Sequence, residues 1–121
     1  MNGLGCSGSV GPNYPNPFNP DTRFQFTVGD PASCNGQRHK VSIRIYNLLA
    51  QVVAVPKVEG GSSTVSGGEP IENLDLECGN YTAYWNGKYL NTNREVGSGV
   101  YFYRLEVDGR PASVGKMFYA K

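Results

Sequence analysis

Few side chains in this chain of 121 residues are of types that do chemistry on a substrate, and the single histidine is the first candidate. His39 stands between Arg38 and Lys40. A histidine that acts as a general base needs a nucleophile and an acid that orients its ring, and the sequence offers no such set around His39. We therefore expect His39 in a solvated loop, no catalytic residue and no enzyme activity.

Two neighbouring carboxylates, Asp75 and Glu77, are candidates for binding a metal ion. They alternate with Leu74 and Leu76, so in an extended segment both carboxylates point to water. Their oxygens suit calcium, but the acidic, glycine-containing loop of an EF-hand is missing. Zinc is not expected either, because no two cysteines are separated by two residues. The sequence predicts no metal site and no cofactor.

The three cysteines, Cys6, Cys34 and Cys78, leave three single pairings open. Cys34 and Cys78 both lie in loops that flank expected core strands, which makes them the disulfide candidate. Such a bond would stabilise the fold by about 3–4 kcal/mol. Cys6 remains in a glycine-rich lead, where it is either a free thiol or the site of an intermolecular bridge.

Tyrosines suggest a different chemistry, because aromatic rings stack on the C–H faces of sugars. Tyr84, Tyr89, Tyr101 and Tyr103 are the candidates for a sugar-binding face. The alternative is that these rings fill the core and cover strand edges. Both interpretations stay open at the level of sequence.

Charge and hydropathy exclude several classes of partner. The net charge is +1, and the 11 basic and 10 acidic residues are spread along the chain. We expect no nucleic-acid binding, since there is no basic stripe, and no membrane span, since no run approaches about 18 apolar residues. The first residues lack the features of a signal peptide. This favours a mature or excised piece of a longer protein over a cytosolic chain.

Strand-like segments must position these residues. The chain has 16 glycines and 8 prolines, and no window repeats apolar residues at helical spacing. Alternating segments occur instead, and a two-residue Asp108-Gly109 turn lies between the last two, which is a strong hairpin signal. The main expected strands are 22–28, 40–46, 79–86, 98–105 and 114–121. The pattern predicts an all-β, immunoglobulin-like antiparallel β-sandwich of about seven strands, with Trp85 in its core.

The chain divides into two parts by composition. Residues 1–20 are rich in proline and glycine and are expected to form an extended N-terminal arm or linker. Tyr14 and Phe18 are its apolar residues, and we expect both to dock the arm onto the sandwich. Residues 21–121 form the β-sandwich domain.

Several motifs in order resemble a known family. They begin with Asn16-Pro-Phe-Asn-Pro-Asp-Thr22, continue with Val41-Ser-Ile-Arg-Ile-Tyr-Asn47 and Tyr81-Thr-Ala-Tyr-Trp-Asn-Gly87, and end with the hairpin. Over about residues 12–121 the chain resembles the type A C-terminal sorting domain of the type IX secretion system, and it is similar to the immunoglobulin-like domain of flagellar hook-capping proteins. The sorting-motif-like residues are Ser98, Gly99, Tyr101, Tyr103, Leu105, Lys116, Met117 and Lys121.

The resemblance implies a β-sandwich at the C-terminus of a secreted bacterial protein, located outside the cell or at its surface. Its partners would be proteins, namely the secretion machinery that reads the domain. Two alternatives remain. One is a self-assembling filament subunit that lays its N-terminal arm on the next copy, and the other is a carbohydrate-binding module.

Overall fold

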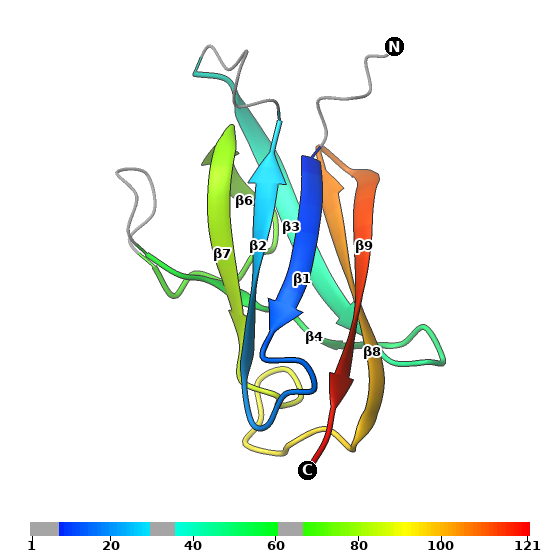
Figure 1. Ribbon diagram of the computed structural model, residues 1–121. Helices are drawn as coiled ribbons and strands as arrows, with labels where there is room; N and C mark the ends of the chain where they lie inside the picture. The colour runs from blue at the N-terminus through cyan, green and yellow to red at the C-terminus, as the bar shows by residue number, and fades with distance from the viewer. Residues whose placement is uncertain (1–7, 30–35, 61–66) are drawn as a thin grey trace.

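The computed structural model describes residues 8–29, 36–60 and 67–121, and these residues form nine strands and no helix. Two antiparallel sheets pack face to face (Figure 1). The first contains, in spatial order, β1 (Gly8–Tyr14), β2 (Thr22–Val28), β7 (Gly79–Trp85) and β5 (Lys57–Val58). The second contains β4 (Val52–Ala54), β3 (Arg38–Tyr46), β8 (Gly99–Val107) and β9 (Arg110–Tyr119), and β6 (Leu74–Glu77) also pairs with β3.

This architecture confirms the predicted antiparallel β-sandwich. The described residues contain more than the seven or so strands expected from the sequence. The additional ones include β5 and β6, which span two and four residues. Segments this short are too brief to show a period in the sequence.

Alternation sorts the long strands into one buried and one outer face, as predicted. Tyr101, Tyr103 and Leu105 of β8 point inward. The ring of Tyr103 stacks on Phe24, with ring centroids 4.0 Å apart. Trp85 is 2% exposed, so its predicted place in the core is confirmed. The other large, fully buried side chains are Phe18, Phe26, Val28, Ile43, Ile45, Ile71, Leu76, Met117 and Tyr119.

The terminal hairpin also forms as predicted. Val107 pairs with Arg110, which leaves Asp108 and Gly109 as the two-residue turn. Their φ angles are 53° and 81°. Positive φ at both central residues is what a type I′ turn requires, and this turn matches the twist of the strands on either side.

The expected boundary at residue 20 does not coincide with the start of the sheet. Residues 8–14 form β1, which pairs with β2 at the edge of the first sheet. The sequence did not show this strand, because it contains two glycines and a proline, which are all rare in strands. The arm that remains is the short turn-rich segment 15–20.

Of the two expected docking residues, one is confirmed. Phe18 is 1% exposed and stacks on Tyr119 with ring centroids 4.9 Å apart. The prediction was wrong for Tyr14, which is 82% exposed. The neighbouring Asn13 points inward, where its Nδ2 donates to Thr22 Oγ1 at 3.1 Å. Since successive side chains of a strand alternate, Tyr14 must face solvent.

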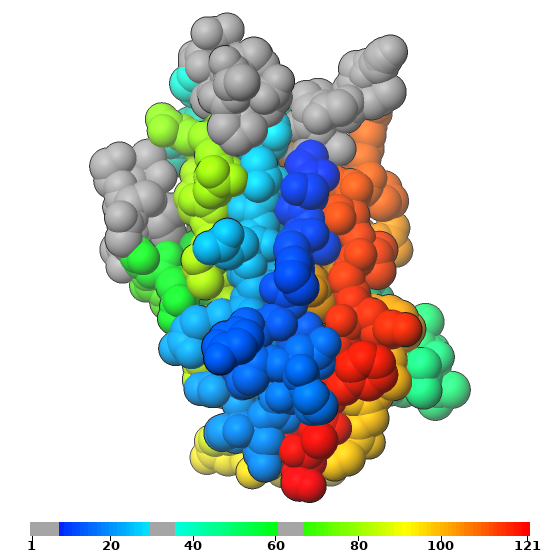
Figure 2. Space-filling view, viewed as in Figure 1, coloured from blue at the N-terminus to red at the C-terminus, as the bar shows by residue number. Residues whose placement is uncertain are grey.

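Strand β1 and residues 15–18 run beside β9, although they are far apart in sequence (Figure 2). We call this line of contact the seam. Along it, Ser113 Oγ accepts a hydrogen bond from Val10 N at 3.2 Å, and Asn16 Oδ1 accepts one from Phe118 N at 3.0 Å. Phe18 N donates to Phe118 O at 2.9 Å. The seam therefore satisfies polar groups along an edge strand that would otherwise offer them to another chain.

Candidate functional site

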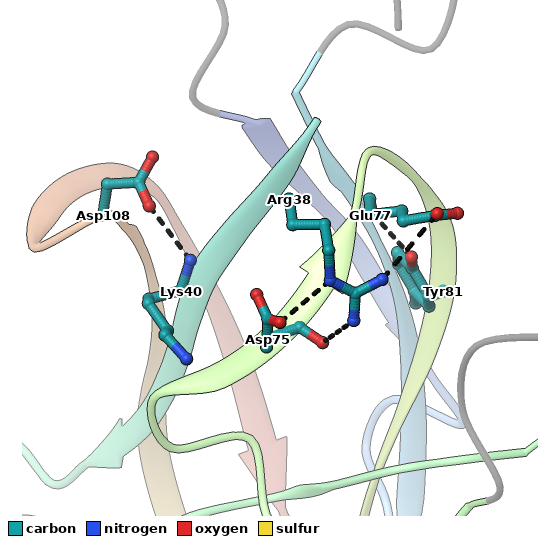
Figure 3. A network of polar contacts seen from close by, with 6 residues as sticks. All are labelled: Arg38, Lys40, Asp75, Glu77, Tyr81 and Asp108. Atoms are coloured by element: carbon teal, nitrogen blue, oxygen red, sulfur yellow. Dashed lines mark hydrogen bonds and ion pairs between the residues drawn. The ribbon is translucent and has the colours of Figure 1, made fainter. Parts of the chain in front are cut away.

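His39 lies in strand β3, not in the solvated loop that the sequence suggested. Its Nδ1 is 2.7 Å from Asp108 Oδ2. The backbone N of Lys40 donates to Asp108 Oδ1 at 3.0 Å, and Figure 3 shows this second contact. Partial burial raises the pKa of Asp108, but the hydrogen bonds from His39 and Lys40 outweigh it and leave that pKa below its ordinary value. The arrangement fastens the tip of the β8–β9 hairpin to β3.

Asp75 and Glu77 are partly exposed as expected, and both lie against Arg38 (Figure 3). Arg38 Nε is 2.9 Å from Asp75 Oδ2, and Nη1 is 3.7 Å from Glu77 Oε1. The hydrogen bond from Arg38 lowers the pKa of Asp75. These carboxylates thus join β6 to β3. Within the described residues no three His, Cys, Asp or Glu side chains cluster so that they could hold a metal ion.

Cys78 lies between β6 and β7, half-buried, and its backbone N donates to Gln37 O at 3.2 Å. Cys6 and Cys34 lie outside the described residues. Gln37 is close to Cys34 in the sequence, so the position of Cys78 is compatible with the proposed bond. The Cys34–Cys78 disulfide stays a prediction.

The four tyrosines proposed for a sugar-binding face separate into two pairs. Tyr101 and Tyr103 are 7% and 1% exposed, and their hydroxyls donate to the carbonyls of Gly97 and Gly11 at 2.6 Å. Burial raises the pKa of both hydroxyls. For this pair the alternative interpretation, that the rings fill the core, is confirmed, because both rings lie on the inward face of β8. Tyr84 and Tyr89 are half-buried at the surface.

The sorting-motif-like residues divide in the same way. Tyr101, Tyr103, Leu105 and Met117 build the core. Ser98, Gly99, Lys116 and Lys121 are exposed. Lys121 N donates to Ser98 Oγ at 3.0 Å, and Lys116 Nζ lies 5.7 Å from the centroid of the Phe118 ring. Only the exposed group is in a position to meet a partner.

A first candidate surface is the outer side of the second sheet. Here Phe102 of β8 pairs with Tyr46 of β3, and Phe118 of β9 pairs with Val100. We define the apolar face as Tyr46, Leu48, Phe102, Val114 and Phe118. Leu48, Val114 and Phe118 are 69%, 60% and 41% exposed. A shallow hollow of about 240 Å³ lies among Tyr46, Leu48, Phe102 and Val114. The sequence gives one indication of this face, because some of the outward-facing residues of the hairpin are apolar.

A second candidate is a cavity of about 580 Å³ beside the first sheet. Its walls come from residues 54–57, the end of β7, residues 68–70 and the loop 86–93. Tyr84 and Tyr89 line it together with Lys57 and Lys88. The sequence indicated the two tyrosines but not the cavity, because its walls come from segments that are distant along the chain.

Comparison with known proteins assigns no family to the chain. No family model and no curated protein matches the chain. Among solved structures, the chain is similar to the Pseudomonas fluorescens alkylpurine DNA glycosylase AlkC bound to DNA containing an abasic site analog. The TM-score is 0.48 at 11% identity, over 94% of this chain and 29% of that one. In the part of the chain that the structure describes, no helix has the length and apolar character needed to cross a membrane.

Proposed function

We propose that this chain is a non-catalytic β-sandwich module of a secreted or surface-exposed bacterial protein, and that it binds a protein partner through the apolar face. The observation that carries this proposal is the gathering of exposed apolar side chains on one side of a small sandwich. Contiguous apolar surface of this kind is typical of protein contact sites.

The surroundings of the apolar face support a protein partner. Arg44 Nη1 lies 3.0 Å from Glu106 Oε1, and Arg104 Nε lies 3.6 Å from Glu106 Oε2. These pairs and Lys116 place polar groups around the exposed rings. An apolar centre with a polar rim is the usual anatomy of a protein–protein interface.

The resemblance to sorting domains suggests which partner this is. The hairpin that carries the sorting-motif-like residues also supplies three residues of the apolar face, Phe102, Val114 and Phe118. Lys116 lies between the last two on β9. A secretion receptor would therefore read the outward side chains of the hairpin, while the inward ones keep its shape.

A fusion experiment tests this function. The chain is attached to the C-terminus of a reporter carrying its own export signal, in a bacterium with type IX secretion and in a translocon-deficient strain. We expect the reporter at the cell surface only in the first strain, and a strong reduction with Val114→Glu. Gln25→Glu, which adds the same charge to an exposed site on β2, should have no effect. Equal surface reporter in both strains would contradict the sorting function.

Self-assembly remains an alternative, but through a contact other than the N-terminal arm. The described part of the arm, residues 8–20, is bound to the sandwich of its own chain through β1 and Phe18. Copies would instead meet through the apolar face. Light scattering at increasing concentration tests this, and a monomer at high concentration would exclude it.

An extracellular location also predicts the Cys34–Cys78 disulfide, because such bonds persist in oxidising compartments. Alkylation of the native, unreduced protein followed by peptide mass analysis should label Cys6 alone. Label on Cys34 or Cys78 would contradict the pairing.

A further inference from the structure

The cavity beside the first sheet has a distinct charge pattern. Lys57 and Lys88 line it, and none of the described residues that line it is Asp or Glu. Two nearby acids already have partners, since Asp21 Oδ2 accepts from Tyr84 Oη at 3.0 Å and Glu59 pairs with Arg23 at 2.8 Å. The cavity therefore favours a ligand with negative charge.

Its uncharged lining suits a ligand with many hydroxyl groups. Asn86, Asn91, Asn93 and Thr92 line the cavity. A side-chain amide carries both donors and an acceptor, so it can bind two adjacent hydroxyls at once. Asn91 and Asn93 are exposed, and the structure shows no hydrogen bond from either side chain to another described residue.

Two aromatic rings complete the lining. Tyr84 is held by its hydroxyl bond to Asp21 and by Arg23, whose Cζ lies 4.8 Å from the ring centroid. Tyr89 has the Arg94 Cζ 5.4 Å from its own centroid. Restrained rings offer flat apolar contact at low entropic cost, which suits the C–H face of a pyranose.

The loop that carries most of these groups is anchored at several points. Trp85 Nε1 donates to Lys88 O at 3.0 Å, and Leu90 N donates to Val53 O at 2.9 Å. Within the loop, Tyr89 N donates to Arg94 O at 2.9 Å. A site ordered before binding loses less entropy when a ligand enters.

We infer that this cavity binds an acidic sugar, a uronate unit of a polysaccharide, with its carboxylate at Lys57 and Lys88, its hydroxyls at the loop amides and its ring against Tyr84 or Tyr89. The volume of about 580 Å³ is within the range of small-molecule sites, roughly 300–1,000 Å³. The cavity and the hollow on the apolar face have no lining residue in common. Either proposal can therefore fail without the other.

Calorimetric titration with hexagalacturonate tests the inference, and the fluorescence of Trp85, the single tryptophan, provides a local signal. We expect hexagalacturonate to bind with higher affinity than a neutral glucan of the same length. Lys57→Gln and Lys88→Gln should each weaken it roughly tenfold, as expected for loss of a charged hydrogen bond. About 1 M salt should weaken it as well, because the Debye length falls to about 3 Å.

Matched variants separate this site from general effects. Lys116→Gln removes the same charge from the second sheet and should leave the affinity unchanged. Tyr84→Leu keeps an apolar side chain but removes the ring, and should weaken binding while the circular dichroism spectrum stays that of the wild type. The inference is overturned if hexagalacturonate does not bind, if both lysine variants bind like the wild type, or if hexaglutamate binds equally well.

Discussion

The seam and the cavity use aromatic side chains in opposite ways. At the seam, Phe18 is almost completely buried between Tyr119 and Trp85, with centroid distances of 4.9 and 5.5 Å. At the cavity, Tyr84 and Tyr89 are half-buried, and each has an arginine over its ring. The first region buries apolar area and closes an edge, while the second holds its rings in place and leaves them accessible.

Trp85 shows how the two regions are joined. Its ring packs against Phe18, and its indole N–H bonds to Lys88 O in the loop of the cavity. Trp85 thus contributes to the core with its ring and to the cavity with its N–H. The type of an aromatic residue therefore does not show by itself whether the side chain serves stability or recognition. Its partner groups and its exposure decide that.

Loss of the Phe18 ring should produce the largest effect. Phe18→Ala removes a buried ring and leaves a cavity, so the free energy of unfolding should fall by about 3–5 kcal/mol. Urea denaturation monitored by Trp85 fluorescence measures it. Tyr14→Ala, in the same arm but 82% exposed, should stay within about 0.5 kcal/mol of the wild type. Similar losses for both variants would show that Phe18 has no special role at the seam.

A methyl group added to β9 should have the next largest effect. The Cβ of an alanine at Gly115 would overlap the ring of Tyr103, and overpacking of this kind costs about 1–3 kcal/mol. Gly97→Ala is the control, because no atom lies within 4 Å of the Cβ position there. Thermal unfolding of the two variants compares them. Equal melting temperatures would mean that the Tyr103 ring moves aside freely.

Alkaline pH should weaken the seam through Tyr119. Burial, and then its hydrogen bond to Glu95, raise the pKa of Tyr119 to about 12 from 10.0. Between these values the unfolded chain loses the Tyr119 proton and the folded chain keeps it. The stabilisation that protonated Tyr119 gives to the folded state is therefore complete below pH 10 and is lost as the pH rises toward 12. Tyr119→Phe should show a smaller loss of stability across that range. If the free energy of unfolding depends on pH equally in the variant and the wild type, this titration is excluded.

Asp108, away from both regions, should give the smallest effect. Its lowered pKa adds stability that is present above its ordinary value of 3.8 and is lost as the pH falls through the lower, folded-state value. The effect is small because its side chain is 54% exposed. Asp108→Asn should be less sensitive to acid than the wild type in urea denaturation at several low pH values. A steeper acid dependence would contradict the sign of the shift.

The sequence was sufficient for features that depend on local pattern. Alternation predicted the inward faces of β2 and β7, and Asp108-Gly109 predicted the hairpin turn. Alternation also places Tyr101 and Tyr103 on one face with Leu105, but only the structure shows that this face is the buried one. Alternation was enough to leave Tyr84 outside, opposite to Trp85.

Features that depend on distant contacts were not predictable from sequence. Strand β1 exists because β2 offers it backbone partners and β9 lies alongside, and its own glycines and proline give no sign of this. The cavity likewise needs residues 54–57 and the loop 86–93 to meet. Tyr14 was misplaced because the inward position next to it is taken by Asn13, a polar residue whose Nδ2 donates to Thr22 Oγ1.

The most direct test of the division between the two regions measures unfolding free energy and hexagalacturonate affinity on the same two variants. Phe18→Ala should lose about 3–5 kcal/mol of stability while its folded fraction binds with wild-type affinity. The double variant Lys57→Gln with Lys88→Gln should stay within about 0.5 kcal/mol of wild-type stability and lose the binding. If the lysine variant unfolds as readily as Phe18→Ala, or if it binds like the wild type, the division is contradicted.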